Sequence, residues 1–159
     1  MNSDTIVTGI QAILAPALGI SATALLLLGL QNRYSSIINR IRLLNEEKRE
    51  YSQRVVEKSD MDYSENMRRL SVLSQIEKLF DRCRDVRNSI LYIQGSILLF
   101  VLTSVSIALN LFFSDILLRD LPLILFSLGM LLVLAGVIYS AKDVVNSYRI
   151  TEIEVKADE

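Results

Sequence analysis

The sequence contains no histidine, no tryptophan and a single cysteine, Cys83. Most zinc sites and His-based catalytic arrangements need histidine or several cysteines, so both are excluded. A disulfide framework is excluded too, because one thiol has no partner within the chain. No glycine-rich loop follows an expected strand, which argues against a phosphate-binding loop. We therefore expect no catalytic residues, no metal site and no cofactor, in a protein that is not an enzyme.

Charged residues are missing from three long stretches of the chain. None lies between Asp4 and Arg33, between Arg87 and Asp115, or between Asp120 and Lys142. Each stretch is longer than the roughly 20 residues that a helix needs to cross a bilayer. Hydrophobic residues make up 51% of the 159 positions, and charge is gathered between these stretches, unlike in a soluble domain. The sequence predicts an all-α integral membrane protein with three transmembrane helices, at 7–30, 89–113 and 121–141.

Arginines near the ends of these spans predict their orientation. They follow the first span and precede the second, as Arg33, Arg40, Arg42, Arg82, Arg84 and Arg87. Because positive residues stay on the cytoplasmic side, we expect 31–88 inside and both 1–6 and 114–120 outside. The tail, 142–159, is then cytoplasmic, and the expected location is the cell inner (plasma) membrane. The first span lacks the basic residues that precede a signal peptide, so we expect it to be retained.

Residues 31–88 have the pattern of a long antiparallel helical hairpin. Polar, turn-favouring residues at 59–63 predict the reversal between its two arms. In both arms apolar residues recur at steps of three and four, the spacing of a coiled-coil seam. In the first arm only Lys48 interrupts this apolar pattern. The seam positions are Tyr34, Ile37, Ile41, Leu44, Lys48, Tyr51 and Val55 in the first arm and Val72, Ile76, Leu79, Cys83, Val86 and Ile90 in the second. Neither glycine nor proline lies between Leu30 and Ile90, so each span should continue into its arm as one helix.

A hairpin of two helices has little core, and several apolar residues lie just beside its seam. These residues are Ile38, Leu43, Leu73 and Phe80. They favour a further partner, and we expect a homo-oligomer in which neighbouring hairpins pack side by side. The lipid bilayer and a cytoplasmic protein are the other expected partners. Nucleic acid is not expected, because the hairpin has only a mild positive excess and no basic stripe.

Polar residues form a stripe along the second span. In lipid such groups favour contact with protein or water. One interpretation is a permeation path lined by Ser96, Thr103, Ser106 and Asn110, with Gln11 of the first span near its outer end. The other is that the hydroxyls bond to their own helix or join neighbouring helices. The small residues on one face of the first span, Ala12, Ala15, Gly19, Ala22 and Thr23, likewise fit either a path or a helix contact.

Basic residues at the membrane boundary have two interpretations. They line the cytoplasmic mouth of such a path, or they contact anionic lipid head groups. The residues concerned are Arg33, Arg40, Arg42, Arg84 and Arg87. Arg33 and Arg40 belong to an Asn-Arg pair that is repeated seven residues apart on one helical face.

The function we expect from the sequence is an oligomeric ion or small-solute channel, and the alternative is a membrane-anchored scaffold whose hairpin binds a protein partner. Active transport is disfavoured, because no charged residue lies in the middle of a span. The opening pattern IQAILAPALGISATALLLLGLQNRYSSIINRIRLLNEE resembles the bacterial DUF2721 family of small uncharacterised membrane proteins. The likeness rests on Ala15-Pro16-Ala17, Asn32-Arg33, Arg40 and Arg42. It implies a bacterial inner-membrane protein and brings no catalytic residue.

Overall fold

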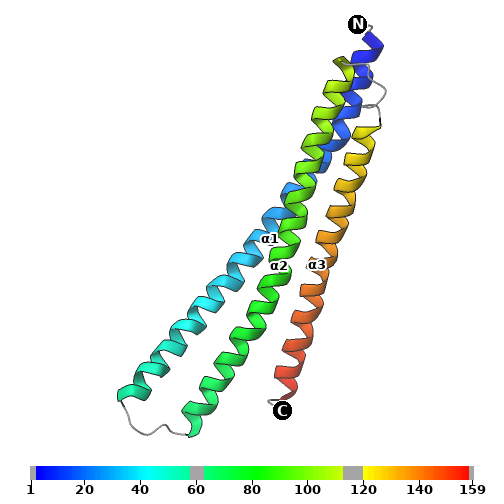
Figure 1. The fold of residues 1–159 in the computed structure, drawn as a ribbon. Coiled ribbons are helices and arrows are strands. Elements are labelled where there is room, and N and C mark those ends of the chain that lie inside the picture. The colour runs from blue at the N-terminus through cyan, green and yellow to red at the C-terminus, as the bar shows by residue number, and fades with distance from the viewer. Residues whose placement is uncertain (1–2, 58–62, 113–119, 158–159) are drawn as a thin grey trace. The chain divides into compact units, whose positions relative to one another are not determined.

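Three long α-helices make up the structure, a computed structural model that describes residues 3–57, 63–112 and 120–157. Helix α1 is Ser3–Glu57, α2 is Tyr63–Phe112 and α3 is Leu121–Ala157 (Figure 1). Each is long and apolar enough to cross a membrane, so the prediction of an all-α protein with three such helices is confirmed. Most of the turn predicted at 59–63 and of the loop predicted at 114–120 lies outside the described residues.

The scarcity of helix-breaking residues explains why the helices continue past the uncharged stretches. α1 passes from an uncharged stretch into a charged one, and α2 passes from a charged stretch into an uncharged one, both without interruption, as expected where neither glycine nor proline occurs. α3 starts after Asp120, whose carbonyl accepts a hydrogen bond from the Ile124 amide at 3.2 Å. α3 also continues beyond 141, the predicted end of its span, to Ala157. No glycine or proline follows Gly136, so nothing in the sequence ends the helix at the membrane.

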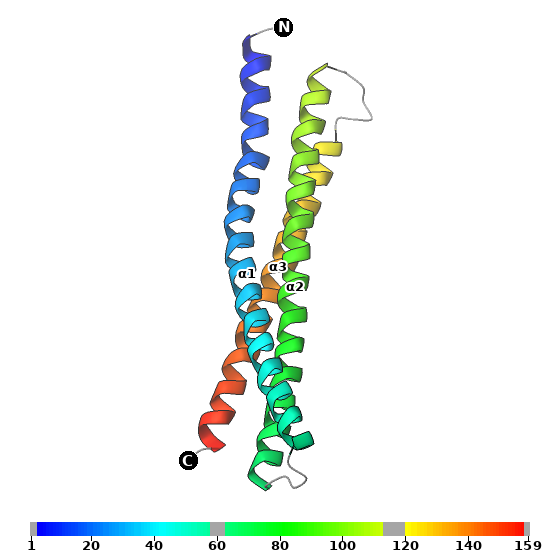
Figure 2. The ribbon, with the colours of Figure 1, turned by 90° about the vertical axis from the view of Figure 1, so that its left-hand side faces the viewer.

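The chain divides into two compact units. The first comprises Met1–Gln31 and Asn88–Ala141, and the second comprises Asn32–Arg87 and Lys142–Glu159. Each helix therefore contributes one segment to each unit. In the first unit α2 runs antiparallel to both α1 and α3, as the two perpendicular views show (Figures 1 and 2).

Phe100 is the centre of the first unit. Its side chain is fully buried between two glycines of neighbouring helices. A Cβ added at Gly19 of α1 would lie 3.1 Å from the ring, and one added at Gly129 of α3 would lie 2.8 Å from it. Gly136 of α3 makes room for Ile93 of α2 in the same way, at 2.8 Å. Glycine at these positions lets the three helices approach closely, which is how membrane helices commonly pack.

The second unit buries a different set of side chains. The buried ones are Ile37, Ile41 and Leu44 of α1 with Val72, Cys83 and Val86 of α2, and all six are positions of the predicted seams. Tyr34 of α1 lies beside Cys83 of α2. Of the apolar residues expected beside the seam, Leu43 is 64% exposed and Phe80 is 57% exposed, whereas Ile38 and Leu73 are half-buried. The second unit thus has a narrow apolar core and leaves apolar surface uncovered.

Candidate functional site

The polar stripe of α2 lies inside the first unit. Ser96 and Thr103 are buried, and their hydroxyls donate to carbonyls of their own helix, at Ile93 (2.7 Å) and Leu99 (2.8 Å). Ser89 instead donates to the Gly136 carbonyl of α3 at 2.6 Å. Hydroxyls with these partners are stable in an apolar interior without contacting water.

The remaining polar candidates have different surroundings. Ser106 is buried, and its hydroxyl makes no hydrogen bond within the described part of the chain. Asn110, one turn further along α2, is half-buried, and Gln11 of α1 is exposed. Of the residues predicted to line a path, Ser96, Thr103 and Ser106 therefore face the interior of the first unit, whereas Gln11 faces outward.

Asp143 of α3 is the centre of an ionic cluster in the second unit. Its side chain is fully shielded from solvent and bonds to arginines of both other helices. Arg33 Nη2 of α1 lies 3.2 Å from Asp143 Oδ2, and Arg82 Nε of α2 lies 3.3 Å from Asp143 Oδ1. Beside it, Lys142 of α3 pairs with Asp85 of α2 at 3.3 Å. The cluster joins α3 to both other helices, and the two guanidinium groups compensate a buried carboxylate that would otherwise be costly.

Sequence reasoning predicted a boundary role for Arg33 but missed Asp143. A signal was present, because Gly129, Gly136 and Asp143 are spaced seven residues apart along α3. Residues at this spacing share one helical face, and the two glycines contact α2. A carboxylate on that same face is expected to be buried, and a buried carboxylate needs a cation beside it. Position 143 therefore predicts an ion pair with one of the arginines.

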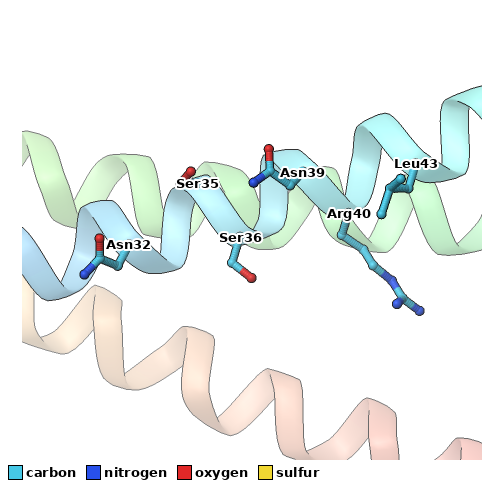
Figure 3. Close-up of a pocket in the computed structure, with 6 residues that line it drawn as sticks. All are labelled: Asn32, Ser35, Ser36, Asn39, Arg40 and Leu43. Carbon is cyan, nitrogen blue, oxygen red and sulfur yellow. The ribbon is translucent and has the colours of Figure 1, made fainter.

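A shallow groove lies on the exposed side of α1 in the second unit. Its volume is about 490 Å³, and it is lined by Asn32, Ser35, Ser36, Asn39, Arg40 and Leu43 (Figure 3). Ser36 and Arg40, one turn apart, point to the same side of the helix in this view. No residue lining the groove is acidic, so Arg40 makes it electropositive. Both members of the repeated Asn-Arg pair contribute to this region, as Asn32 and as Asn39-Arg40.

The other boundary arginines remain on the surface. Arg42 is exposed, and Arg84 pairs with Asp81 of its own helix at 3.1 Å. Arg87 is exposed and lies near Tyr34. The structure therefore brings Arg33, but not Arg42 or Arg84, into a buried ionic network.

The pKa of Tyr34 is raised above its ordinary value. The largest cause is the negative charge that Cys83 carries when it is ionised, followed by hydrogen bonding to Cys83 and by burial, whereas the charge of Arg87 has a smaller, opposite effect.

The described residues contain no cluster of three His, Cys, Asp or Glu side chains that could hold a metal ion.

A family model described as "Protein of unknown function (DUF2721)" matches residues 13–153, nearly the whole chain. The match covers all three apolar helices, the groove and the ionic cluster. No curated protein and no solved structure matches the chain. Together with the three helices that can cross a membrane, the match identifies a multi-pass membrane protein that belongs to the DUF2721 family.

Proposed function

We propose that this protein is a membrane-anchored scaffold. Its three spans hold the region between spans one and two at the cytoplasmic face of the inner membrane, where an exposed apolar stripe binds an amphipathic helix of another protein. The positions of the boundary arginines support this orientation.

The observation that carries the proposal is the apolar stripe on α2, defined by Leu70, Leu73 and Phe80. These residues are three and seven positions apart, so they share one side of the helix. Leu70 is 56% exposed and Phe80 is 57% exposed, and both precede the predicted start of the span at 89. Outside the membrane such surface contacts water unless another protein covers it, which is why exposed apolar patches mark interaction sites.

The chemistry around the stripe indicates what kind of partner fits. Glu77 interrupts the stripe, and Asp81 and Arg84 lie near it on exposed positions, so both signs of charge border the apolar surface. A helix with its own apolar stripe and with flanking charges of both signs would cover this surface and pair with the charged side chains along its edges. Because these charges are of both signs, the surface would not attract a strongly acidic or strongly basic ligand.

An ion or small-solute channel is the second proposal. The observation that favours it is Ser106, whose buried hydroxyl has no hydrogen-bond partner among the described residues, with Asn110 one turn away. A path past these two groups would carry ions or small polar solutes. Two facts favour the scaffold instead: the hydroxyls of Ser96 and Thr103 are engaged by their own helix, and Arg33 is held by Asp143.

Co-isolation from native membranes tests the scaffold. The full-length chain carrying Leu70→Ser and Phe80→Ser is compared with wild type and with a control that carries Ser71→Ala and Lys78→Ser, exposed off the stripe on the same helix. We expect proteins that accompany wild type and control but not the apolar-stripe variant. Identical sets from all three chains would contradict the proposal.

Ion flux tests the channel separately. Purified chain in liposomes should conduct above the level of empty liposomes, and Ser106→Val or Asn110→Leu should lower that flux. Flux equal to that of empty liposomes, for common cations and anions alike, would exclude the channel and leave the scaffold untouched.

A further inference from the structure

The exposed side of α1 carries a seven-residue repeat of its own. In the second unit Asn32, Ser36, Asn39 and Leu43 follow one another at steps of four, three and four, and all four are exposed. They also line the groove of Figure 3. This alternation is the spacing by which two helices pack in a left-handed coiled coil. We call these four residues the outer seam, to distinguish them from the buried seam around Ile37 and Leu44.

The polar groups of the outer seam have no hydrogen-bond partners within the described residues. The amides of Asn32 and Asn39 and the Ser36 hydroxyl are all exposed in the groove. An asparagine side chain contains both a donor and an acceptor, so two identical amides satisfy each other. Asparagines that face each other across a parallel two-stranded coiled coil fix its register in this way. The groove therefore suits a surface with asparagine at the same heights.

The charges beside the outer seam fit a parallel copy of the same helix. In a parallel pair, residues on opposite flanks of the seam and five positions apart meet across the interface. Arg42 and Glu47 hold these two positions and have opposite charges. In a symmetric pair the contact occurs twice. The seam ends after Leu43, because Glu46 and Glu50 occupy the next two positions of the repeat.

The repeat continues along the sequence into span one, where Leu25 and Gly29 take the next positions toward the N-terminus. A Cβ added at Gly29 would meet no atom within 4 Å, whereas one added at Gly19, Gly95, Gly129 or Gly136 would meet a side chain of a neighbouring helix. The packing within one chain thus accounts for those four glycines and not for Gly29. Glycine on an exposed membrane helix face allows a second helix to approach closely.

We propose that the outer seam of α1 binds the outer seam of a second copy of this chain, with the two helices parallel. Copies that insert in the same orientation present the same residues at the same depth, so identical positions meet. Asn32 and Asn39 then pair with their counterparts, Ser36 and Gly29 permit close approach, and Arg42 pairs with the partner's Glu47. This interface lies on α1 and does not depend on the stripe of α2.

Disulfide crosslinking in native membranes tests the interface. Cys83 is first replaced by serine, and Asn39→Cys is compared with Asn45→Cys, which is also exposed on α1 but lies off the seam. A disulfide forms only between closely approaching backbones, so oxidation should give covalent dimers with Asn39→Cys in several-fold excess over Asn45→Cys. Ser36→Cys is a second seam position with the same expectation. Equal dimer yields on and off the seam, or none at either seam position, would overturn the proposal.

Charge reversal provides a readout that a folding defect would not imitate. In the Asn39→Cys chain, Arg42→Glu alone and Glu47→Arg alone should each lower the dimer yield about threefold. The chain with both reversals restores the attraction and should return to the original yield. A double variant that dimerises no better than the single ones, or single variants without effect, would rule out this parallel register.

Discussion

Arg33 of α1 and Asp143 of α3 form an ion pair, with 3.2 Å between Nη2 and Oδ2, although 110 positions separate them in the chain. The carboxylate is fully shielded from solvent, and Arg82 of α2 binds its other oxygen. Arg33, which the sequence marks as the end of the first span, is therefore also a structural contact. Its role in joining helices limits its availability to a permeating ion.

Replacing Asp143 by asparagine removes the charge that both arginines compensate. We expect the free energy of unfolding to fall by about 1–3 kcal/mol, below the value for a wholly buried pair because both arginines are partly exposed. Asp81→Asn is the matched control, since its partner Arg84 is a mostly exposed neighbour on the same helix. That control should change stability by less than about 0.5 kcal/mol. Thermal unfolding of detergent-solubilised protein, followed by circular dichroism, measures both, and equal effects would contradict this role of Asp143.

Adding one methyl group at Gly129 should disturb the centre of the first unit. The new Cβ would lie 2.8 Å from the buried Phe100 ring, so Gly129→Ala should destabilise by about 1–3 kcal/mol. Gly29→Ala, which meets no atom within 4 Å, should leave the unfolding of the single chain nearly unchanged. Combining Gly129→Ala with Phe100→Leu tests the cause, because a smaller side chain should recover part of the loss. No recovery in this double variant would indicate another cause.

The hydroxyls of α2 should contribute differently to the free energy of unfolding, depending on whether they bond to another helix or to their own. Ser89 donates to a carbonyl of α3, so Ser89→Ala should cost about 1 kcal/mol of stability. Within the described residues Thr103 donates only to its own helix, and Thr103→Val keeps the shape of the side chain, so the change in stability should stay within about 0.5 kcal/mol. Unfolding in detergent compares the two. A cost at Thr103 equal to that at Ser89 would show that the Thr103 hydroxyl has a further role.

Labelling of single cysteines in intact cells tests the predicted orientation. In a Cys83→Ser background, a membrane-impermeant maleimide should label Asp120→Cys, which precedes α3 on the expected outer side. Asn45→Cys should react only after the cells are permeabilised, because the arginines around it are expected to keep it inside. Both positions are exposed, so burial does not confound the comparison. The opposite labelling pattern would reverse the orientation.

Much of this architecture could be predicted from the sequence, because its strongest signals are three long stretches without charged residues and the absence of helix breakers between them. Three helices able to cross a membrane follow from these two features alone. The helical extension of α3 beyond 141 was missed, although the same absence of glycine and proline after Gly136 indicates it. Asp143 was missed because its charge only becomes informative once its face of α3 is known. Whether Ser96 faces a path or its own helix is likewise decided by packing, which periodicity cannot supply.

Photo-crosslinking at Phe80 in native membranes tests the central claim most directly. A photoreactive amino acid replaces Phe80 on the exposed stripe of α2, and a second chain carries it at Lys78, which is exposed on the same helix but off the stripe. The scaffold proposal predicts an adduct with one reproducible, different protein at position 80 and much less of it at 78. Adducts only with further copies of this chain, or equal adducts at both positions, would contradict a scaffold that binds its partner through this stripe.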